Sequence, residues 1–261
     1  MTDPDTYEVF AVKYAERDAR RPEHFLGGDP HDVPMSMDYF VWAIVGRDRT
    51  IVVDTGFDTL DATARNRRLL RTASEALKLV GVDAAAAPNV VLTHLHYDHV
   101  GGFDQFPNAR FHLQDREMAF ATGRNMLESE YSHAFTARHV AELVMAVHAK
   151  RVAFHDGDAE LAPGVSVHHI GGHTDGLQAV RVNTAAGPLV LASDATHYYE
   201  NMEATRPFPI VFDVPAMIAG YDILRSLAGA RGVIVPGHDP MVFERHPAAD
   251  RSLSGIAVRL G

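Results

Sequence analysis

The chain has 261 residues, of which 46% are hydrophobic and 22% are charged, and this composition supplies enough apolar side chains for a globular core. Its formal net charge is −10, which argues against a partner bound through its phosphates, such as nucleic acid. The chain has no cysteine, which excludes disulfides, thiolate nucleophiles and cysteine metal ligands. Any metal would therefore be held by histidine, carboxylate or water.

The N-terminal segment, MTDPDTYEVFAVKYAERD, lacks the basic start and apolar centre of a secretory signal. No stretch reaches the ~18 consecutive apolar residues of a membrane helix. We therefore expect a cytoplasmic protein that forms a single domain over residues 1–261 and has no membrane partner.

In the first part of the chain, strands are predicted at 7–15, 37–45 and 50–56, with a long polar loop between the first two. Residues 59–80 carry leucines among charges and alanines, which predicts one helix that ends at Gly81. The basic run RNRRLLR (65–71) is then interpreted as the solvated face of that helix.

Further along, strands are predicted at 89–96 and 109–114, and residues 115–150 are helical with an interruption near 121–133. Residues 152–194 are β-rich, with a hairpin at NTAAGP. A helix at 214–229 and a buried strand at 232–239 follow. This order of β-rich blocks and helices predicts an α/β fold with two sheets and helices outside them.

The segment VVLTHLHYDHVGG (90–102) places three histidines and an aspartate just after a buried strand: His94, His96, Asp98 and His99. Side chains two apart in an extended segment face the same side, so His94 and His96 can converge on one point. Six positions cannot hold a complete site, and the remaining ligands must come from elsewhere.

Three later strand ends carry side chains of the right type, namely His173, Asp194 and His238, with His169 as an alternative to His173. Together with the first motif they make seven candidate ligands. One zinc ion usually takes four, so seven suit two divalent metal ions that share one carboxylate. A set of nitrogen and oxygen ligands suits Zn²⁺ and also Fe, Mn or Co.

The motif HLHYDH, followed in order by His173, Asp194 and His238, resembles the metallo-β-lactamase superfamily over residues 94–238. The resemblance implies an αββα sandwich of two mixed sheets flanked by helices, with the site at one edge of the sheets. It also implies that one metal is held by His94, His96 and His173. The other would be held by Asp98, His99 and His238, with Asp194 bridging the two.

Residues 34–58 and the stretch SDATHYYENME (193–203) are similar to the N-acyl homoserine lactonases. This similarity implies a hydrolase that opens the lactone ring of quorum-sensing signals. The absence of cysteine argues against a true β-lactamase of the common zinc type. Several such lactonases have a tyrosine three residues after the bridging aspartate, where this chain has His197, followed by Tyr198 and Tyr199.

The expected mechanism follows from the two cations, which would lower the pKa of a water between them so that hydroxide attacks an ester-type carbonyl. Asp98, His197 and Tyr198 are the expected catalytic residues, with His197 or Tyr198 donating a hydrogen bond to the oxyanion. Asp54 either orients the ligand loop or forms a local turn before Gly56.

The substrate is expected to lie between the 22–37 loop and residues 118–135, whose apolar side chains suit an acyl chain: Phe25, Met35, Met37, Met118, Phe120 and Met126. The expected partners are a small-molecule lactone or ester and, in a homodimer, a second copy of the chain. Alternative activities on the same ligands are hydrolysis of thioesters, as in glyoxalase II, and of phosphodiesters or phosphotriesters. Outside enzymes, the alternative is a metal-containing ligand-binding protein.

Overall fold

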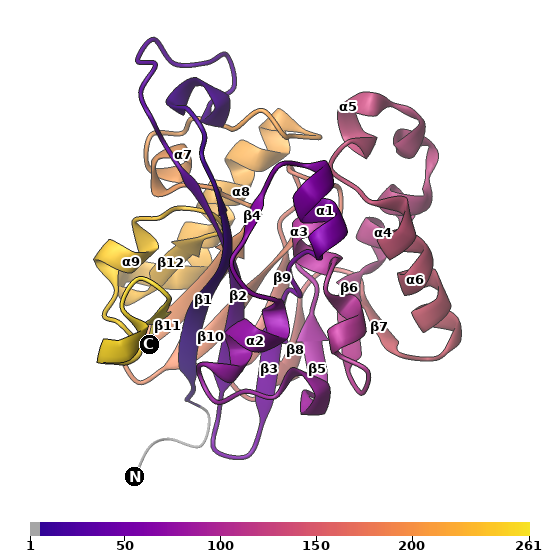
Figure 1. The fold of residues 1–261 in the computed structure, drawn as a ribbon, viewed down its shortest axis with the longest axis vertical. Coiled ribbons are helices and arrows are strands. Elements are labelled where there is room, and N and C mark those ends of the chain that lie inside the picture. Colours follow the sequence, from indigo (N-terminus) through magenta and orange to yellow (C-terminus); the bar gives the residue numbers. More distant parts are fainter. Residues whose placement is uncertain (1–5) are drawn as a thin grey trace.

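The computed structural model describes residues 6–261, and within them the strands form two sheets (Figure 1). The first sheet has eight strands in the order β13-β1-β2-β3-β5-β6-β7, with β4 paired to β1. Its strands are β1 (Glu8–Arg17), β2 (Met37–Val45), β3 (Thr50–Val53), β4 (Arg68–Leu69), β5 (Asn89–Val91), β6 (Arg110–Gln114), β7 (Val152–His155) and β13 (Ala257–Arg259). Residues 1–5 of the segment that we judged not to be a secretory signal lie outside the described residues.

The second sheet has five strands in the order β12-β11-β10-β9-β8. They are β8 (Ala159–Ala162), β9 (Val165–His169), β10 (Gln178–Thr184), β11 (Gly187–Ser193) and β12 (Val233–Pro236). Both sheets are mixed, because β3, β5, β6 and β7 pair in parallel, as do β11 and β12, whereas the other pairs are antiparallel.

Strand β2 shows how the two sheets share the core. Its residues alternate between the faces, and both faces are buried, which explains its continuous apolar sequence. Phe40, Trp42 and Ile44 belong to the cluster between the sheets, which also holds Val180 and Leu191 of the second sheet. The intervening residues of β2 belong to a separate cluster on the outer face of the first sheet.

Helices cover the outer face of each sheet. The helices are α1 (Thr59–Ala64), α2 (Ala73–Lys78), α3 (Tyr97–Val100), α4 (Asp115–Thr122), α5 (Ser129–Ser132), α6 (Ala137–His148), α7 (Tyr199–Glu203), α8 (Val214–Ala228) and α9 (Val242–Arg245). Buried residues of α2, α3, α4 and α6 pack in the outer cluster of the first sheet. Helix α8 packs on β10, β11 and β12 of the second sheet. The predicted αββα sandwich is thus confirmed.

Most predicted elements match, but the single helix over 59–80 is wrong. The segment forms two short helices, α1 and α2, and between them β4 pairs with Ala15 and Glu16 of β1. Helix α1 ends at Ala64, and two residues later Asn66 has a left-handed backbone with a φ of 53°, which prevents the helix from continuing. The run 65–71 is therefore a strand-bearing connection and not a helix face.

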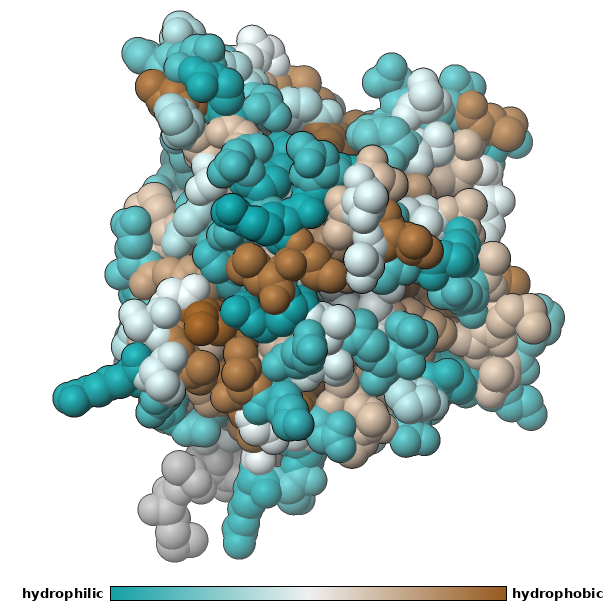
Figure 2. Space-filling model, in the orientation of Figure 1, coloured by the Kyte–Doolittle hydropathy of each residue, from teal (hydrophilic) through white to brown (hydrophobic). Residues whose placement is uncertain are grey.

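The surface is mostly hydrophilic on the face shown in Figure 2, with smaller hydrophobic patches between, as suits an acidic chain. Among residues 6–261, no helix is long and apolar enough to cross a membrane.

Candidate metal centre

Five of the candidate ligands lie in loops that follow strands, and the other two, Asp98 and His99, lie in α3. His94 and His96 follow β5, His173 follows β9, Asp194 follows β11 and His238 follows β12. The prediction had strand 89–96 continue through the first two histidines, but β5 ends at Val91 and leaves them in a loop. Because these strands point the same way within each sheet, their carboxyl ends bring the loops together at one edge of the sandwich.

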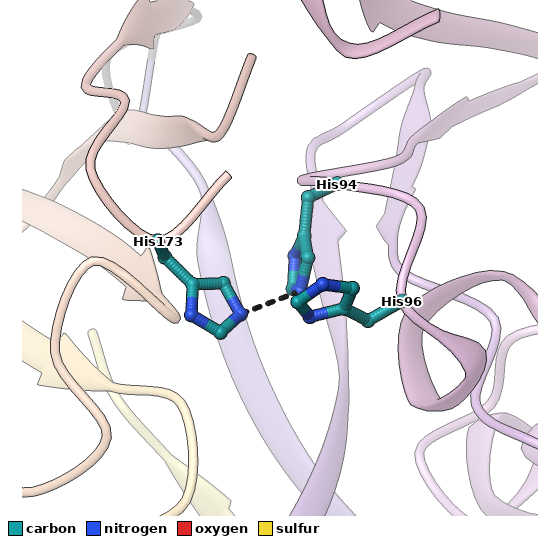
Figure 3. Close-up of side chains that lie close together, drawn as sticks. All are labelled: His94, His96 and His173. Carbon is teal, nitrogen blue, oxygen red and sulfur yellow. Dashed lines mark hydrogen bonds between the residues drawn. The ribbon is translucent and has the colours of Figure 1, made fainter. Parts of the chain in front are cut away.

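His94, His96 and His173 form the first cluster, with their rings turned toward one another (Figure 3). The Nε2 atoms of His94 and His173 are 3.2 Å apart, and the ring centroids of His96 and His173 are 4.5 Å apart. Nitrogens bound about 2.0–2.1 Å from a tetrahedral zinc ion would be ~3.3 Å apart. The spacing of these histidines therefore fits a bound metal ion.

Asp98, His99 and His238 form the second cluster. Asp98 Oδ2 is 3.7 Å from the Nε2 atoms of both histidines. Asp194 lies between the two clusters. Its Oδ1 is 3.4 Å from His99 Nε2 and 3.0 Å from His238 Nε2 of the second cluster, and its Oδ2 is 3.4 Å from His173 Nε2 of the first and 3.3 Å from His238 Nε2. One carboxylate thus presents an oxygen to each cluster.

The Nδ1 atoms of His173 and His238 are fixed by hydrogen bonds to backbone carbonyls, which leaves their Nε2 atoms to face the centre. His173 Nδ1 donates to Ile210 O at 2.7 Å, and His238 Nδ1 donates to Asp38 O at 2.9 Å. Within the described residues, His99 Nε2 and Asp194 Oδ1 are buried without a hydrogen-bond partner. Such atoms are costly unless a further group binds them, and a metal ion is a group of the right kind.

The charges at the centre also favour cations. Burial lowers the pKa of His94 and His96 well below their ordinary value, so both present neutral nitrogens. Burial acts in the same direction on His99, but the negative charges of Asp194 and Asp54 outweigh it and raise the pKa of His99 well above its usual range. The buried carboxylates thus create a negative field that a divalent ion would balance.

Asp54 fixes the ligand loop from below, as one of its two predicted roles required. Its Oδ2 accepts a hydrogen bond from His99 Nδ1 at 2.7 Å, and its Oδ1 accepts one from Thr93 N at 2.8 Å. Asp54 itself has a φ of 61°, a left-handed conformation that a short polar residue tolerates and that turns its carboxylate toward His99.

Comparison with known proteins places the fold and the ligand motif in one group. A family model described as the metallo-beta-lactamase superfamily matches residues 37–238. The chain belongs to the metallo-β-lactamase superfamily. Among curated relatives, it is 29% identical over 174 residues to an N-acyl homoserine lactonase of Bacillus sp, and 28% identical over 173 residues to the lactonase AiiA of Bacillus thuringiensis subsp. kurstaki. Each match covers 65% of this chain and spans 60% of the relative's length.

Solved structures of the superfamily share the architecture. A quorum-quenching N-acyl homoserine lactone lactonase superposes with a TM-score of 0.76 at 21% identity, over 91% of this chain and 94% of its own. The dizinc quorum-quenching lactonase AidC superposes with a TM-score of 0.72 at 18% identity, over 91% of this chain and 89% of its own. At these identities the likeness establishes the fold.

Among the predicted catalytic residues, the structure brings Asp98 and His197 to the centre but not Tyr198. His197 Nε2 donates to Asp194 Oδ2 at 2.9 Å, and its ring stacks on Phe208 with centroids 3.5 Å apart. Burial lowers the pKa of His197 to about 3 against the attraction of Asp194, so its imidazole is neutral. Tyr198 is buried and is not among the residues that line the cavity, and its hydroxyl donates to Ser36 O at 3.0 Å.

Glu117 of α4 is a residue of this centre that the sequence did not reveal. It is fully buried, its Oε1 accepts from Leu95 N at 2.8 Å, and its Oε2 accepts from Thr174 Oγ1 at 2.6 Å and Gly176 N at 3.1 Å. Leu95 lies between His94 and His96, and Thr174 follows His173, so one carboxylate holds both loops of the first cluster. In the sequence it is one acidic residue of a helix among several, and nothing marks it.

A cavity of about 90 Å³ opens beside the clusters, and both predicted segments line it, the 22–37 loop through Glu23, His24 and Met37 and the 118–135 segment through His133 and Ala134. Of the apolar residues proposed as walls, only Met37 lines it. Met35, Met118 and Met126 pack against the outer core of the first sheet, Phe120 lines a smaller neighbouring space, and Phe25 lies between the guanidinium groups of Arg21 and Arg206. His169, the alternative to His173, bonds Asp175 O instead.

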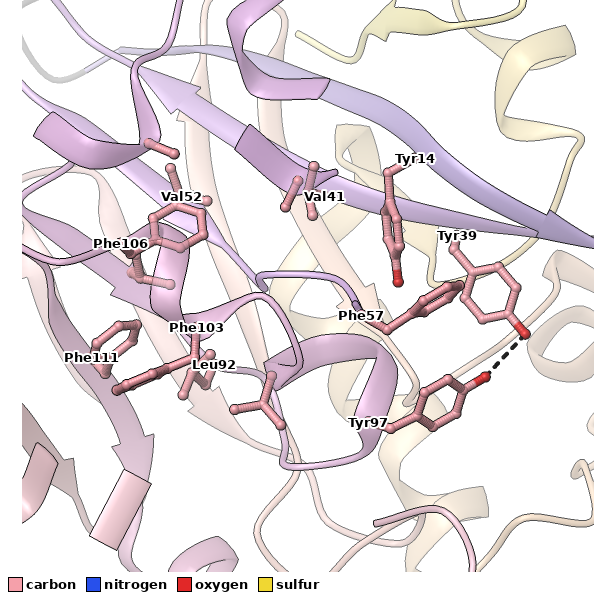
Figure 4. Packing of buried hydrophobic residues seen from close by; sticks show 14 of the residues in the cluster. Tyr14, Tyr39, Val41, Val52, Phe57, Leu92, Tyr97, Phe103, Phe106 and Phe111 are labelled. Carbon is pink, nitrogen blue, oxygen red and sulfur yellow. Dashed lines mark hydrogen bonds between the residues drawn. The ribbon is translucent and has the colours of Figure 1, made fainter. Parts of the chain in front are cut away.

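Under the cavity lies a cluster of aromatic rings formed by Tyr14, Tyr39, Phe57 and Tyr97 (Figure 4). Tyr14 donates its hydroxyl to Asp98 O at 2.8 Å, and the hydroxyls of Tyr39 and Tyr97 are 3.4 Å apart. The ring centroids of Tyr39 and His238 are 5.0 Å apart. These rings hold the second cluster against the first sheet.

A third group of possible ligands, Asp58, Asp61 and His139, is already neutralised by the protein. Asp61 Oδ2 bonds His139 Nε2 at 2.6 Å, and Asp58 pairs with Arg138 at 2.5 Å. This group joins α1 to α6 and gives no indication of a further metal.

Proposed function

We propose that this chain is a hydrolase with two divalent metal ions that opens lactone rings, and that N-acyl homoserine lactones are its substrate class. The observation that carries the proposal is the position of Asp194, which presents one carboxylate oxygen to each of two ligand clusters. The names of the relatives support the same activity, since the curated relatives of this chain described above are N-acyl homoserine lactonases.

The proposed ligands are His94, His96 and His173 for one ion and Asp98, His99 and His238 for the other, with Asp194 shared. We propose Zn²⁺, which binds histidine and carboxylate in tetrahedral geometry, and the same donors also accept Fe, Mn or Co. Bound there, two divalent ions would supply an activated water at neutral pH and polarise the ester carbonyl.

Side chains of the protein would orient the shared carboxylate and transfer the proton. Asp194 accepts a hydrogen bond from His197 on Oδ2, and we assign both of its oxygens to the two metal ions. Asp98 also lines the cavity, so we assign to it the transfer of a proton from the attacking water to the leaving alkoxide. His197, neutral and held flat against Phe208, fixes the orientation of Asp194 and presents its ring to the substrate.

The decisive measurement is hydrolysis of a lactone panel by the metal-loaded protein and by the same protein after chelation. We expect ring opening that is lost on chelation and restored by added Zn²⁺. A protein that holds two metal equivalents yet hydrolyses no lactone, thioester or phosphodiester would contradict an enzymatic role and favour a metal-containing binding protein. The cytoplasmic location, the homodimer and the absence of nucleic-acid and membrane partners stay predictions.

The bridge itself is tested by Asp194→Asn, because a shared ligand serves both ions. We expect the variant to release both metal equivalents at the same chelator concentration, well below that needed for the unaltered protein. Asp222→Asn, at an exposed position on α8, is the matched control. Loss of a single equivalent from Asp194→Asn would show that the carboxylate serves only one ion.

A further inference from the structure

Arginines line the cavity beside the two clusters, although the chain as a whole carries a net charge of −10. Arg17 comes from the end of β1, and Arg65 and Arg67 come from the connection between α1 and β4. Outside the proposed metal ligands, Glu23 is the one carboxylate among the residues that line the cavity. The cavity wall outside the proposed metal ligands is therefore basic.

The three guanidinium groups differ in how far the protein already satisfies them. The guanidinium of Arg65 already has partners within the protein. It donates hydrogen bonds to His133 O at 2.8 Å and Phe135 O at 3.2 Å. It also lies 3.5 Å from the Asp61 carboxylate and stacks over the ring of Tyr97. Its position is thus fixed by the protein itself, and it needs no ligand.

Arg67 and Arg17 keep unused donors. Arg67 donates to Tyr97 OH at 3.1 Å and to Arg65 O at 2.6 Å, and among residues 6–261 no carboxylate lies within ion-pair distance of it. Arg17 reaches Glu23, a side chain 49% exposed, at 3.5 Å, and its Nε is buried without a hydrogen-bond partner in the described part of the chain. A half-buried guanidinium with free donors is suited to bind an anion from solution.

The connection from Arg67 to the centre is short. Its Nε holds Tyr97 OH, which lies 3.4 Å from Tyr39 OH, and the Tyr39 ring contacts that of His238. The cavity, at about 90 Å³, is small beside the roughly 300–1,000 Å³ of pockets that enclose drug-sized ligands. A ligand that fills it would place its ends close to both the arginines and the metal centre.

We propose that the substrate carries a carboxylate in addition to the ester bond that is hydrolysed, and that Arg67 and Arg17 bind this carboxylate. The inference rests on the proposed function, since it names the class of lactone that the same centre accepts: a compact, anionic one rather than a lactone with a long alkyl chain. A guanidinium matches a carboxylate with two parallel hydrogen bonds, which gives selectivity over a neutral group of the same shape.

The test compares two lactones that differ only at the distal end: N-glutaryl-homoserine lactone, which ends in a carboxylate, and its terminal primary amide. For the metal-loaded protein we expect kcat/KM to be at least tenfold higher for the carboxylate. In the double variant Arg17→Met, Arg67→Met this ratio is expected to fall to near one. Arg68→Met is the matched control, because Arg68 is 64% exposed, pairs with Glu16 outside the cavity and should leave the ratio unchanged.

A merely structural role for Arg67, such as holding Tyr97, would lower both rates and keep the ratio. If Arg67→Met reduces the yield of folded protein, Arg67→Gln keeps a donor for Tyr97 and serves in its place. An unaltered protein with equal rates on both lactones, or a double variant that keeps the preference, would overturn the inference while leaving lactone hydrolysis established.

Binding of glutarate to the metal-loaded protein, measured by calorimetry, gives a second readout that needs no turnover. We expect the double variant to bind it at least tenfold more weakly than the unaltered protein and the Arg68→Met control. If neither lactone is hydrolysed, the proposed function is wrong, and this binding ratio alone decides the anion site: a tenfold loss supports it, and equal binding refutes it.

Discussion

Gly237 offers the sharpest test of how closely the loops at the centre are packed. It lies between Pro236, the end of β12, and the proposed ligand His238. A Cβ added at Gly237 would lie 2.5 Å from Asp194 Oδ1 and 2.9 Å from the carbonyl carbon and oxygen of Ser193. The change to test is therefore Gly237→Ala, which adds a single methyl group beside the shared carboxylate.

The size of the effect follows from these contacts. An ordinary contact begins at 3.4 Å, so the methyl group is too close to the Asp194 oxygen by about 0.9 Å and to the Ser193 backbone by about 0.5 Å. The backbone of β11 cannot easily move, so Asp194 must. Overpacking of this kind costs about 1–3 kcal/mol, which for a chain of this length corresponds to a fall in Tm of roughly 2–12 °C. A displacement near 1 Å in a catalytic centre costs about 10²-fold in rate.

The assay combines three measurements on Gly237→Ala: Tm, metal content after dialysis, and kcat/KM on a hydrolysed lactone. Gly81→Ala is the matched control. Gly81 has a φ of 78° and no atom within 4 Å of an added Cβ, so the change strains the backbone far from the centre. We expect the control to lower Tm while keeping metal and activity. Gly237→Ala with the metal content and activity of the unaltered protein would refute the packing of Gly237 against Asp194.

Three further changes test other contacts. Glu117→Gln replaces one of the two carboxylate oxygens that hold the ligand loops. Although Glu117 is not a proposed ligand, we expect metal binding at the three-histidine cluster to be about 10–100-fold weaker in a chelator competition. Unchanged metal affinity would refute this. His197→Ala should lower turnover more than metal content, and equal loss of both would make it a structural residue. Burial opposes ionisation of Asp61, but hydrogen bonds from His139 and Thr136 outweigh it and hold its pKa below the ordinary 3.8. Ionised Asp61 therefore stabilises the fold at neutral pH, and this contribution is lost as the pH falls through and below 3.8, so the Tm difference between the unaltered protein and Asp61→Asn should shrink in that range. A constant difference from pH 7 to pH 3 would contradict it.

The residues that lie together at the centre could be selected from the sequence by local rules, whereas their division between two metal ions came from the family resemblance and stays a prediction. His94, His96, His173, Asp194 and His238 lie in the loops that follow apolar strands. The ends of strands that run in the same direction meet at one edge of a sheet. His94 and His96 could therefore be paired from their spacing alone. His173, Asp194 and His238 required only that the β-rich blocks form neighbouring strands, which their alternation already indicated.

The arginines of the cavity wall could not be predicted because the position of Arg65 and Arg67 depends on a pairing between distant segments. The leucines and arginines of 65–71 have helical spacing, and nothing local shows that β4 pairs with β1 instead. That pairing turns Arg65 and Arg67 toward the centre. The position of Tyr198 was likewise not visible in the sequence, because the Ser36 carbonyl that accepts its hydroxyl lies 162 residues earlier in the chain; its catalytic role stays a prediction.

The two halves of the centre are held in different ways, and this bears on what a substitution can do there. The loops of the first cluster are joined by one buried carboxylate, that of Glu117, and the Ile210 carbonyl orients His173. The second rests on several contacts at once: Asp54 on His99, the Asp38 carbonyl on His238, and the aromatic rings below Asp98. A change at Glu117 should therefore loosen one cluster alone, whereas no single supporting contact of the second cluster carries it by itself. Asp194 faces both clusters and accepts a hydrogen bond from His197. A substitution that displaces Asp194 should therefore weaken metal binding at both clusters.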